Sequence, residues 1–172
     1  MEDYQIYISY APLNMKYVFK LEENLSEDLA EALCYTPFQP RWPMDLDEKR
    51  SMIDQIQRAD RLLFFPFDKV DPFLRLLNEA AERPDVLSIK ITIYRLASTS
   101  KIARALCRAA ENGKEVTVLM ELRARFDEEN NINWSKVLEE SGCQIIYGVE
   151  GFKCHSKICL ITMRQGEKLS YI

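Results

Sequence analysis

The chain has 172 residues, 47% of them hydrophobic and 29% charged, and its formal net charge at pH 7 is −4. This length and composition suit one globular domain that buries a core, together with an appendage. No apolar run approaches the length of a membrane span, residues 1–10 do not resemble a signal peptide, and the acidic balance gives no support for nucleic-acid binding.

Residues 1–45 are predicted to be the tail of a preceding domain followed by a linker. The alternating segment at residues 4–10 has the pattern of a strand but has no obvious partner nearby, so this part of the chain looks incomplete. Prolines repeat through residues 36–43 and predict a stiff, extended connector. Residues 46–58, with acidic residues at the start and apolar residues at helical spacing, predict a connecting helix.

Residues 59–172 alternate between strand-like and helix-like segments. Asp71 and Pro72 mark the start of one predicted helix, and Gly113 and Gly142 mark the ends of two others. Strands separated by helices indicate an α/β fold with a mostly parallel sheet flanked by helices, and the last two strands predict a hairpin. The predicted strands are 62–67, 86–94, 115–122, 143–147, 157–163 and 169–172, and the predicted helices are 71–81, 100–112 and 132–141.

The cysteines are an odd number and are scattered through apolar contexts, which predicts reduced, buried thiols rather than a disulfide framework. The predicted compartment is therefore the cytoplasm, with peripheral attachment to the inner face of the membrane left open. The cysteines are Cys34, Cys107, Cys143, Cys154 and Cys159.

The only histidine of the chain, His155, lies two residues before Lys157, in a segment that predicts a strand. Side chains two apart on a strand share a face, so the imidazole and the ammonium are expected to project into one site. Such a pair is hard to bury without an anion, and phosphate is the partner that we infer. A structural histidine is the plainer alternative, and a metal site with Cys154 and Cys159 is disfavoured because strand alternation turns Cys154 away.

Two arginines follow predicted strands: Arg95 comes just after the second strand and Arg125 just after the third. Ligands of such sheets bind beyond the carboxyl ends of the strands, and a guanidinium can hold phosphate oxygens with two donors at once. Either arginine alone could instead form a salt bridge, and acidic residues follow Arg125 closely. Together with His155 and Lys157, the two arginines predict one cationic rim.

These residues lie within motifs that resemble the first catalytic domain of the polyphosphate kinase family. The likeness runs in order through residues 59–172, whereas residues 1–45 are only loosely similar to the end of that family's middle domain. Several motifs agree at once, which makes the resemblance specific. The matching runs are 62–68 followed by Asp71 and Pro72, then 89–95, 109–119, 121–131 and 153–157.

The resemblance implies a phospholipase D-like fold and an enzyme that reversibly moves the terminal phosphate of ATP onto inorganic polyphosphate through a phosphohistidine. It assigns the nucleophile to His155, with Lys157 beside it, and the magnesium and phosphate site to Arg95 and Arg125. Because a guanidinium has no free lone pair, the arginines are expected to hold the phosphates that bind Mg²⁺ rather than the metal itself. ATP, ADP and polyphosphate are the implied partners, and nucleic acid is not.

The resemblance also predicts that the chain is a fragment, truncated inside the catalytic domain. The family continues beyond Ile172 into a second catalytic domain and has further domains before this segment, so little turnover is expected from the chain alone, and the full-length enzyme is a candidate homo-oligomer. Two alternatives stay open: a non-catalytic module that binds polyphosphate or a nucleotide, and a phospholipase D-like phosphodiesterase. Phospholipases of this superfamily carry an aspartate where this chain has Thr162, which weakens the second alternative.

Overall fold

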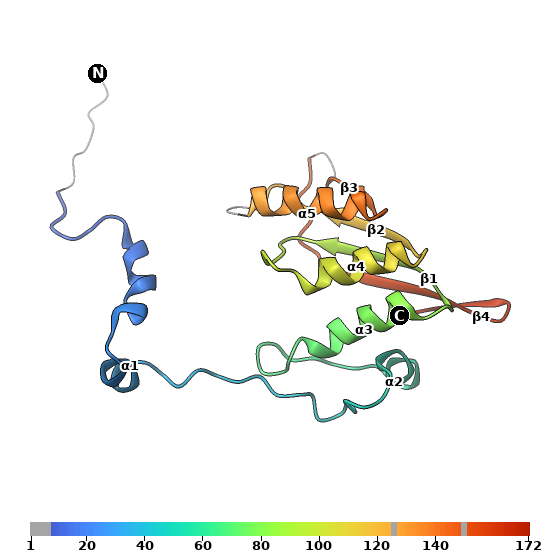
Figure 1. Cartoon of the computed structure of the whole chain (residues 1–172), viewed down its shortest axis with the longest axis horizontal. Helices are drawn as coiled ribbons and strands as arrows, with labels where there is room; N and C mark the ends of the chain where they lie inside the picture. Colours follow the sequence, from blue (N-terminus) through green and yellow to red (C-terminus); the bar gives the residue numbers. More distant parts are fainter. Residues whose placement is uncertain (1–7, 125–126, 149–150) are drawn as a thin grey trace, which may run out of the picture. The chain divides into compact units, whose positions relative to one another are not determined.

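The computed structural model describes residues 8–124, 127–148 and 151–172 of the chain. The chain divides into two units, residues 1–39 and residues 40–172, which are drawn in Figure 1. Each unit has its own architecture. The difference between them lies in burial: the hydrophobic core belongs to the second unit, beginning with Leu46.

The first unit holds three short helices, η1 (Met15–Lys20), η2 (Glu22–Asn24) and α1 (Glu27–Leu33), within its described part. Of the side chains described there, none is buried. Most of the predicted first strand, residues 4–7, lies outside the described residues, and residues 8–10 form no strand. The assignment of residues 1–45 to a preceding domain therefore stays a prediction.

Helices and strands alternate along the second unit, as the sequence predicts. In chain order they are α2 (Met52–Arg58), α3 (Asp71–Glu82), β1 (Val86–Ile93), α4 (Lys101–Glu111), β2 (Glu115–Met120), α5 (Glu128–Glu140), β3 (Gln144–Ile146), β4 (Cys159–Gln165) and β5 (Lys168–Tyr171).

The strands form one five-stranded sheet in the order β3-β2-β1-β4-β5. β1, β2 and β3 pair in parallel, whereas β4 is antiparallel to β1 and β5 is antiparallel to β4. The hairpin between β4 and β5 turns at Gly166, whose φ of 63° favours glycine. The α/β fold, its flanking helices and its terminal hairpin are confirmed, with the parallel pairing confined to the first three strands.

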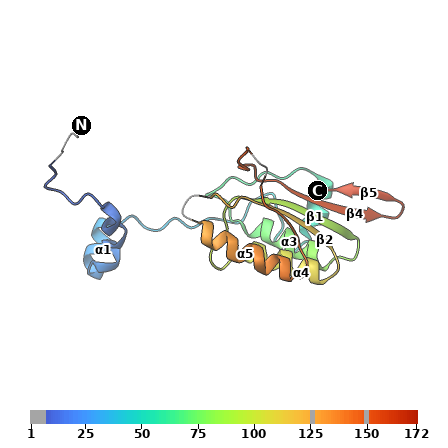
Figure 2. The ribbon, with the colours of Figure 1, turned by 90° about the horizontal axis from the view of Figure 1, so that it is seen from above.

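The two faces of the sheet differ in what they contact. Ile89, Val118 and Met163 are fully buried, on the face that packs against α3, α4 and α5, and Figure 2 shows these helices gathered on one side. Burying each such side chain contributes roughly 1.5–3 kcal/mol, so this interface holds the domain together. On the other face Lys90 is half exposed and lies 3.9 Å from a carboxylate oxygen of Glu115.

Serine caps decide where two helices begin. The Ser100 hydroxyl accepts the N–H of Ala103 at 3.1 Å, and α4 starts at the next residue, close to its predicted start. The Ser51 hydroxyl likewise accepts the N–H of Asp54 at 3.2 Å, so α2 begins at Met52 and not at residue 46. No helix in the described part of the chain has both the length and the apolar character needed to cross a bilayer.

Residues 62–67 form no strand, which corrects the prediction. The two residues after Pro66 both donate their N–H groups to the carbonyl of Phe64, at 3.0 and 2.9 Å, and the Asp68 carboxylate accepts the N–H of Phe64 at 2.8 Å. These bonds close a turn. The apolar run was misleading because its side chains are not buried in the sheet: Leu62 is 83% exposed and Phe64 is 65% exposed.

Arg83, directly after α3, is held by two carboxylates. Its Nη2 lies 2.7 Å from Oδ2 of Asp85, and its Nη1 lies 2.7 Å from Oδ1 of Asp54. The hydrogen bond from Arg83 lowers the pKa of the Asp85 carboxyl below its ordinary value of 3.8. This cluster fixes the connection between α3 and β1.

Replacing Asp85 by asparagine is expected to lower the free energy of unfolding by about 1 kcal/mol at neutral pH, because a charge-assisted ion pair is lost. A carboxyl whose pKa is lower in the folded state stabilises the fold above the unfolded pKa, and that contribution is lost as the pH falls through the folded pKa. The difference between the two proteins should therefore shrink below pH 3.8. Urea unfolding at neutral and acidic pH measures it, and a difference independent of pH would contradict the role of the ion pair.

Candidate active site

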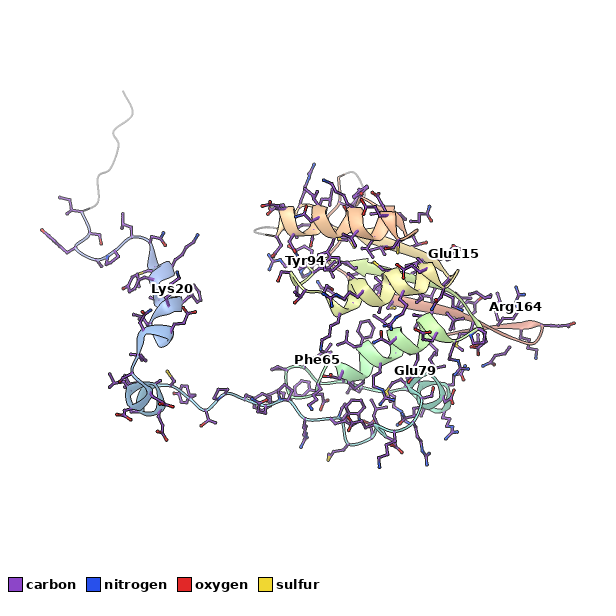
Figure 3. The ribbon with its side chains drawn as sticks, viewed as in Figure 1. Lys20, Phe65, Glu79, Tyr94, Glu115 and Arg164 are labelled. Atoms are coloured by element: carbon purple, nitrogen blue, oxygen red, sulfur yellow. The ribbon has the colours of Figure 1, made fainter. Side chains whose placement is uncertain are left out.

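Three segments of the chain meet at the carboxyl edge of β1 and β2. Tyr94 and Arg95 directly follow β1, and Glu121 directly follows β2. Because β4 is antiparallel to β1, with Cys159 paired near the end of β1, the residues that lead into β4 arrive at the same edge. Figure 3 shows Tyr94 at this end of the sheet and Arg164 at the opposite end. Residues distant in the sequence are thus brought together.

His155 and Lys157 lie in an extended segment before β4 and not on the strand that was predicted from residue 157. β4 begins two residues after Lys157. Thr92 holds the segment: its hydroxyl donates to the carbonyl of Ser156 at 2.7 Å and accepts the N–H of Ile158 at 2.9 Å. The Ile158 carbonyl accepts the backbone N–H of Thr92 at 2.9 Å, but the Ile158 N–H bonds to this hydroxyl and not to a backbone carbonyl, so the strand starts later than predicted.

The extended backbone still alternates its side chains. Cys154 and Ser156 turn toward each other, with 3.7 Å between the sulfur and the hydroxyl oxygen. His155 and Lys157 both reach Tyr94: the imidazole meets the phenol ring edge-on with ring centroids 4.8 Å apart, and the Lys157 Nζ lies 5.0 Å from the ring centroid. The imidazole and the ammonium therefore share one environment, as the sequence predicts.

Arg95 lies beside the same ring, with its Cζ 5.2 Å from the centroid of Tyr94. Its Nε is 3.0 Å from Oδ2 of Asp127, so a carboxylate considered as a partner for Arg125 pairs with Arg95. Lys153 adds a third cation, with its Nζ 5.7 Å from the ring centroid. Arg125 lies outside the described residues, and its place in the site stays a prediction.

Glu121 joins two loops of the site, and sequence reasoning missed it. Its side chain is 5% exposed. One carboxylate oxygen accepts the N–H of Cys154 at 2.9 Å, and the other accepts the N–H of Arg123 at 2.9 Å. A buried carboxylate thus ties the residue before His155 to the loop after β2, which is the loop that leads to Arg125. The only sequence signal was an acidic residue at the end of an apolar strand.

Asn131 supports the same edge from α5. It is fully buried, and its amide nitrogen donates to the carbonyls of Tyr94 at 2.8 Å and Glu121 at 3.0 Å. Its amide oxygen accepts the N–H of Leu96 at 3.4 Å. The predicted helix began one residue too late to include Asn131, whose side chain fixes the ends of β1 and β2 relative to each other.

A cavity of about 600 Å³ opens beside this cluster. Its polar lining residues are Thr92, Tyr94, Arg95 and Lys157, and Phe65, which is labelled in Figure 3 before α3, also lines it. The described residues that line it include no acidic side chain, and the cationic groups of Arg95 and Lys157 suit phosphate oxygens. The apolar lining consists of Leu63, Phe65, Val70, Phe73, Ile91, Ile93, Leu96, Ile102, Ile158 and Cys159.

Metal ligation by side chains has little support at this edge. Within residues 8–124, 127–148 and 151–172, no group of three or more His, Cys, Asp and Glu side chains is placed to hold a metal ion. Burial raises the pKa of the Cys159 thiol to about 11, so this thiol stays protonated at neutral pH and is a poor ligand. The side chains at this edge are cations that surround an imidazole. Such a group favours an anionic ligand.

The sequence model of the family described as polyphosphate kinase C-terminal domain 1 matches residues 51–172. The chain belongs to the polyphosphate kinase family. The matched region begins at Ser51, which caps α2, and contains the whole sheet and every residue of the cluster around Tyr94. The family assignment thus covers the same part of the chain as the candidate site.

Polyphosphate kinases match nearly the whole chain. The polyphosphate kinase of Bacillus cereus is 43% identical over 169 residues, covering 98% of this chain and 24% of that protein. That of Halalkalibacterium halodurans is 44% identical over 164 residues, covering 95% of this chain and 23% of that protein. The chain therefore spans about a quarter of the length of these relatives.

A solved structure supports the same conclusion for the fold. The crystal structure of the polyphosphate kinase from Porphyromonas gingivalis aligns with a TM-score of 0.70 and 37% sequence identity, covering 84% of this chain and 22% of that one. The predicted phospholipase D-like α/β fold is confirmed by this likeness and by the five-stranded sheet.

Proposed function

We propose that this chain forms the first catalytic domain of a polyphosphate kinase that reversibly transfers the terminal phosphate of ATP to inorganic polyphosphate through a phosphohistidine at His155. The observation that carries the proposal is the cluster at the carboxyl edge of the sheet, where His155, Lys157 and Arg95 surround the ring of Tyr94. Membership of the polyphosphate kinase family supports the choice of substrates.

The proposed reaction has two displacements at the same phosphorus. First, the neutral imidazole of His155 attacks the γ-phosphorus of ATP; an N–P bond forms while the P–O bond to ADP breaks, and ADP leaves. Second, a terminal oxygen of polyphosphate attacks that phosphorus, the N–P bond breaks, and the imidazole is restored. Since a phosphoramidate can also return its phosphate to ADP, the reaction runs in both directions.

The cations have a separate role from the nucleophile. Lys157 and Arg95 stabilise the negative charge on the oxygens of the phosphoryl group during transfer, and Arg125 is proposed to join them from the loop after β2. Mg²⁺ arrives with ATP as part of the substrate. Its ligands are phosphate oxygens, because guanidinium groups have no free lone pair for a metal.

The proposal also covers the domain organisation of the chain. Residues 1–45 are assigned to the end of a middle domain and a linker, residues 46–58 to a connecting helix, and residues 59–172 to the first catalytic domain. Further domains of the same protein, including a second catalytic domain, would complete the enzyme; the share of 24% of the Bacillus cereus relative supports this. A cytoplasmic location is also proposed, and the five free cysteines support it.

A chimera tests the proposal: the matched segment of the Bacillus cereus relative is replaced by this chain, and the unaltered relative is assayed in parallel. The chimera is expected to lengthen polyphosphate with ATP and to form ATP from ADP and polyphosphate. Salt-dependent polyphosphate binding without turnover in either direction would favour a non-catalytic module instead. Release of an alcohol or nucleoside from a phosphodiester would favour a phosphodiesterase.

A further inference from the structure

We propose that Tyr94 is a positioning residue whose ring orients the imidazole of His155 and gathers the surrounding cations. This inference rests on the proposed function, in which His155 is the nucleophile. Tyr94 itself forms no bond to the phosphoryl group. Its role is to present the imidazole and the positive charges in one fixed arrangement before the substrate arrives.

The orientation of His155 depends on the contact with Tyr94. The two rings meet edge to face, with an interplanar angle of 78° and 4.8 Å between centroids. Such T-shaped pairs contribute about 0.5–1.5 kcal/mol beyond the burial of their area. Within the described part of the chain, neither ring nitrogen of His155 makes a hydrogen bond to protein. Among the described residues, the contact with Tyr94 is therefore the side-chain interaction that orients the imidazole plane.

Three cations approach the same phenol ring. The Nζ of Lys157, the Cζ of Arg95 and the Nζ of Lys153 lie 5.0, 5.2 and 5.7 Å from its centroid. These distances fall within the range of about 6 Å in which the ring quadrupole attracts a cation. Like charges repel one another, so an electron-rich ring between them lowers the cost of holding them close together. The imidazole of His155 contacts the same ring, so the three cations and the proposed nucleophile share one neighbour.

The backbone of Tyr94 is itself held in place by the fold. The Tyr94 carbonyl accepts a hydrogen bond at 2.8 Å from the amide nitrogen of the fully buried Asn131. The ring also forms part of the wall of the cavity of about 600 Å³. Tyr94 therefore connects the buried support from α5 to the cations around its ring, of which Lys157 also donates a hydrogen bond to the carbonyl of His155.

The first test is spectroscopic and uses the chain itself, in which His155 is the only histidine. Proton NMR of the imidazole C–H groups is compared for the chain, Tyr94→Leu, Tyr94→Phe and the control Tyr171→Leu, whose ring is 62% exposed on β5. Loss of the aromatic ring next to the imidazole should shift these signals in Tyr94→Leu only. Unchanged signals in Tyr94→Leu would overturn the inference.

The second test is kinetic and uses the chimera. Tyr94→Leu is expected to lower kcat by roughly 10- to 100-fold with little change in KM, because the nucleophile is misplaced, whereas Tyr94→Phe should stay within about threefold of the unsubstituted chimera. Circular dichroism checks the fold, and Tyr94→Met replaces Tyr94→Leu if the latter unfolds. Equal rates of phosphohistidine formation with and without the ring would overturn the positioning role of Tyr94 but not the proposed function.

The two proposals fail in different ways. An unsubstituted chimera that transfers phosphate without any phosphohistidine would overturn the proposed function, and the inference that rests on it. A chimera that forms phosphohistidine equally fast with leucine at residue 94 would leave the proposed function intact and remove only the positioning role.

Discussion

Replacing His155 by alanine in the chimera is expected to lower the rate of phosphate transfer by about 10⁴-fold or more, because the proposed nucleophile, which would divide the reaction into two displacements, is lost. Both directions of transfer should fall together, since both pass through the phosphohistidine in the proposed mechanism. The fold should persist, because the imidazole makes no hydrogen bond within the described residues and the neighbouring segment is held by Thr92 and Glu121. Initial rates of polyphosphate and ATP formation measure the loss.

Two controls separate a lost nucleophile from a disturbed loop. Ser156→Ala removes a hydroxyl whose side-chain contact is with Cys154, on the side away from His155, and should leave the rate within about threefold. Added imidazole should partly restore transfer in His155→Ala, because it can enter the space left by the side chain. A variant without His155 that retains most of its activity would exclude the phosphohistidine route.

Replacing Arg95 by alanine is expected to lower kcat by roughly 10²–10³-fold, because charge stabilisation on the transferring phosphoryl group is lost. Arg95→Lys should still lose about tenfold, since a lysine keeps the charge but cannot present a planar pair of donors. The ion pair between Arg95 and Asp127, 3.0 Å long, holds the guanidinium at the site. Both variants would be compared at saturating ATP.

The matched control for Arg95 is Arg164→Ala. Arg164 is exposed on β4, at the end of the sheet opposite Tyr94 (Figure 3), and its removal should leave kcat nearly unchanged. Equal losses for the two alanine variants would mean that the general positive charge of the domain matters and not the place of Arg95. A change in KM alone for Arg95→Ala would assign it to ground-state binding.

The parts of the fold that could be predicted are those with local signals in the sequence. α4 has a serine cap before it and Gly113 after it, and its observed bounds differ from the prediction by one residue at each end. α5 begins four residues earlier than predicted, because two asparagines in its first turns resemble a loop in sequence. Their amides instead bond to the carbonyls of Tyr94, Leu96 and Glu121.

Apolar runs were less informative than caps. Residues 62–67 have the composition of a buried strand but form a turn, because the hydrogen bonds of Asp68 and the missing N–H of Pro66 act against pairing. Residues 157–158 were predicted as strand but are held by the hydroxyl of Thr92. Both outcomes depend on partners that an apolar pattern does not identify.

Some residues of the candidate site could likewise be predicted from the sequence, and others could not. His155 and Lys157 could be predicted from their spacing of two residues, and Arg95 because a charged side chain directly after an apolar strand is conspicuous in a sequence. Tyr94 and Asn131 could not, since their roles depend on contacts between residues far apart in the sequence, such as Asn131 and Tyr94, whose sequence separation is 37. An aromatic residue at the end of a strand is ordinarily explained by packing, and only the structure brings the cations to its ring.

The most direct measurement for the central claim is the location of the phosphate after the chimera reacts with ATP that is radioactively labelled in its γ-phosphate. We expect acid-labile, base-stable label on the peptide that contains His155, its disappearance in His155→Ala, and its release on addition of ADP or polyphosphate. Label on a different residue in an active chimera, with His155 unmodified, would contradict the account.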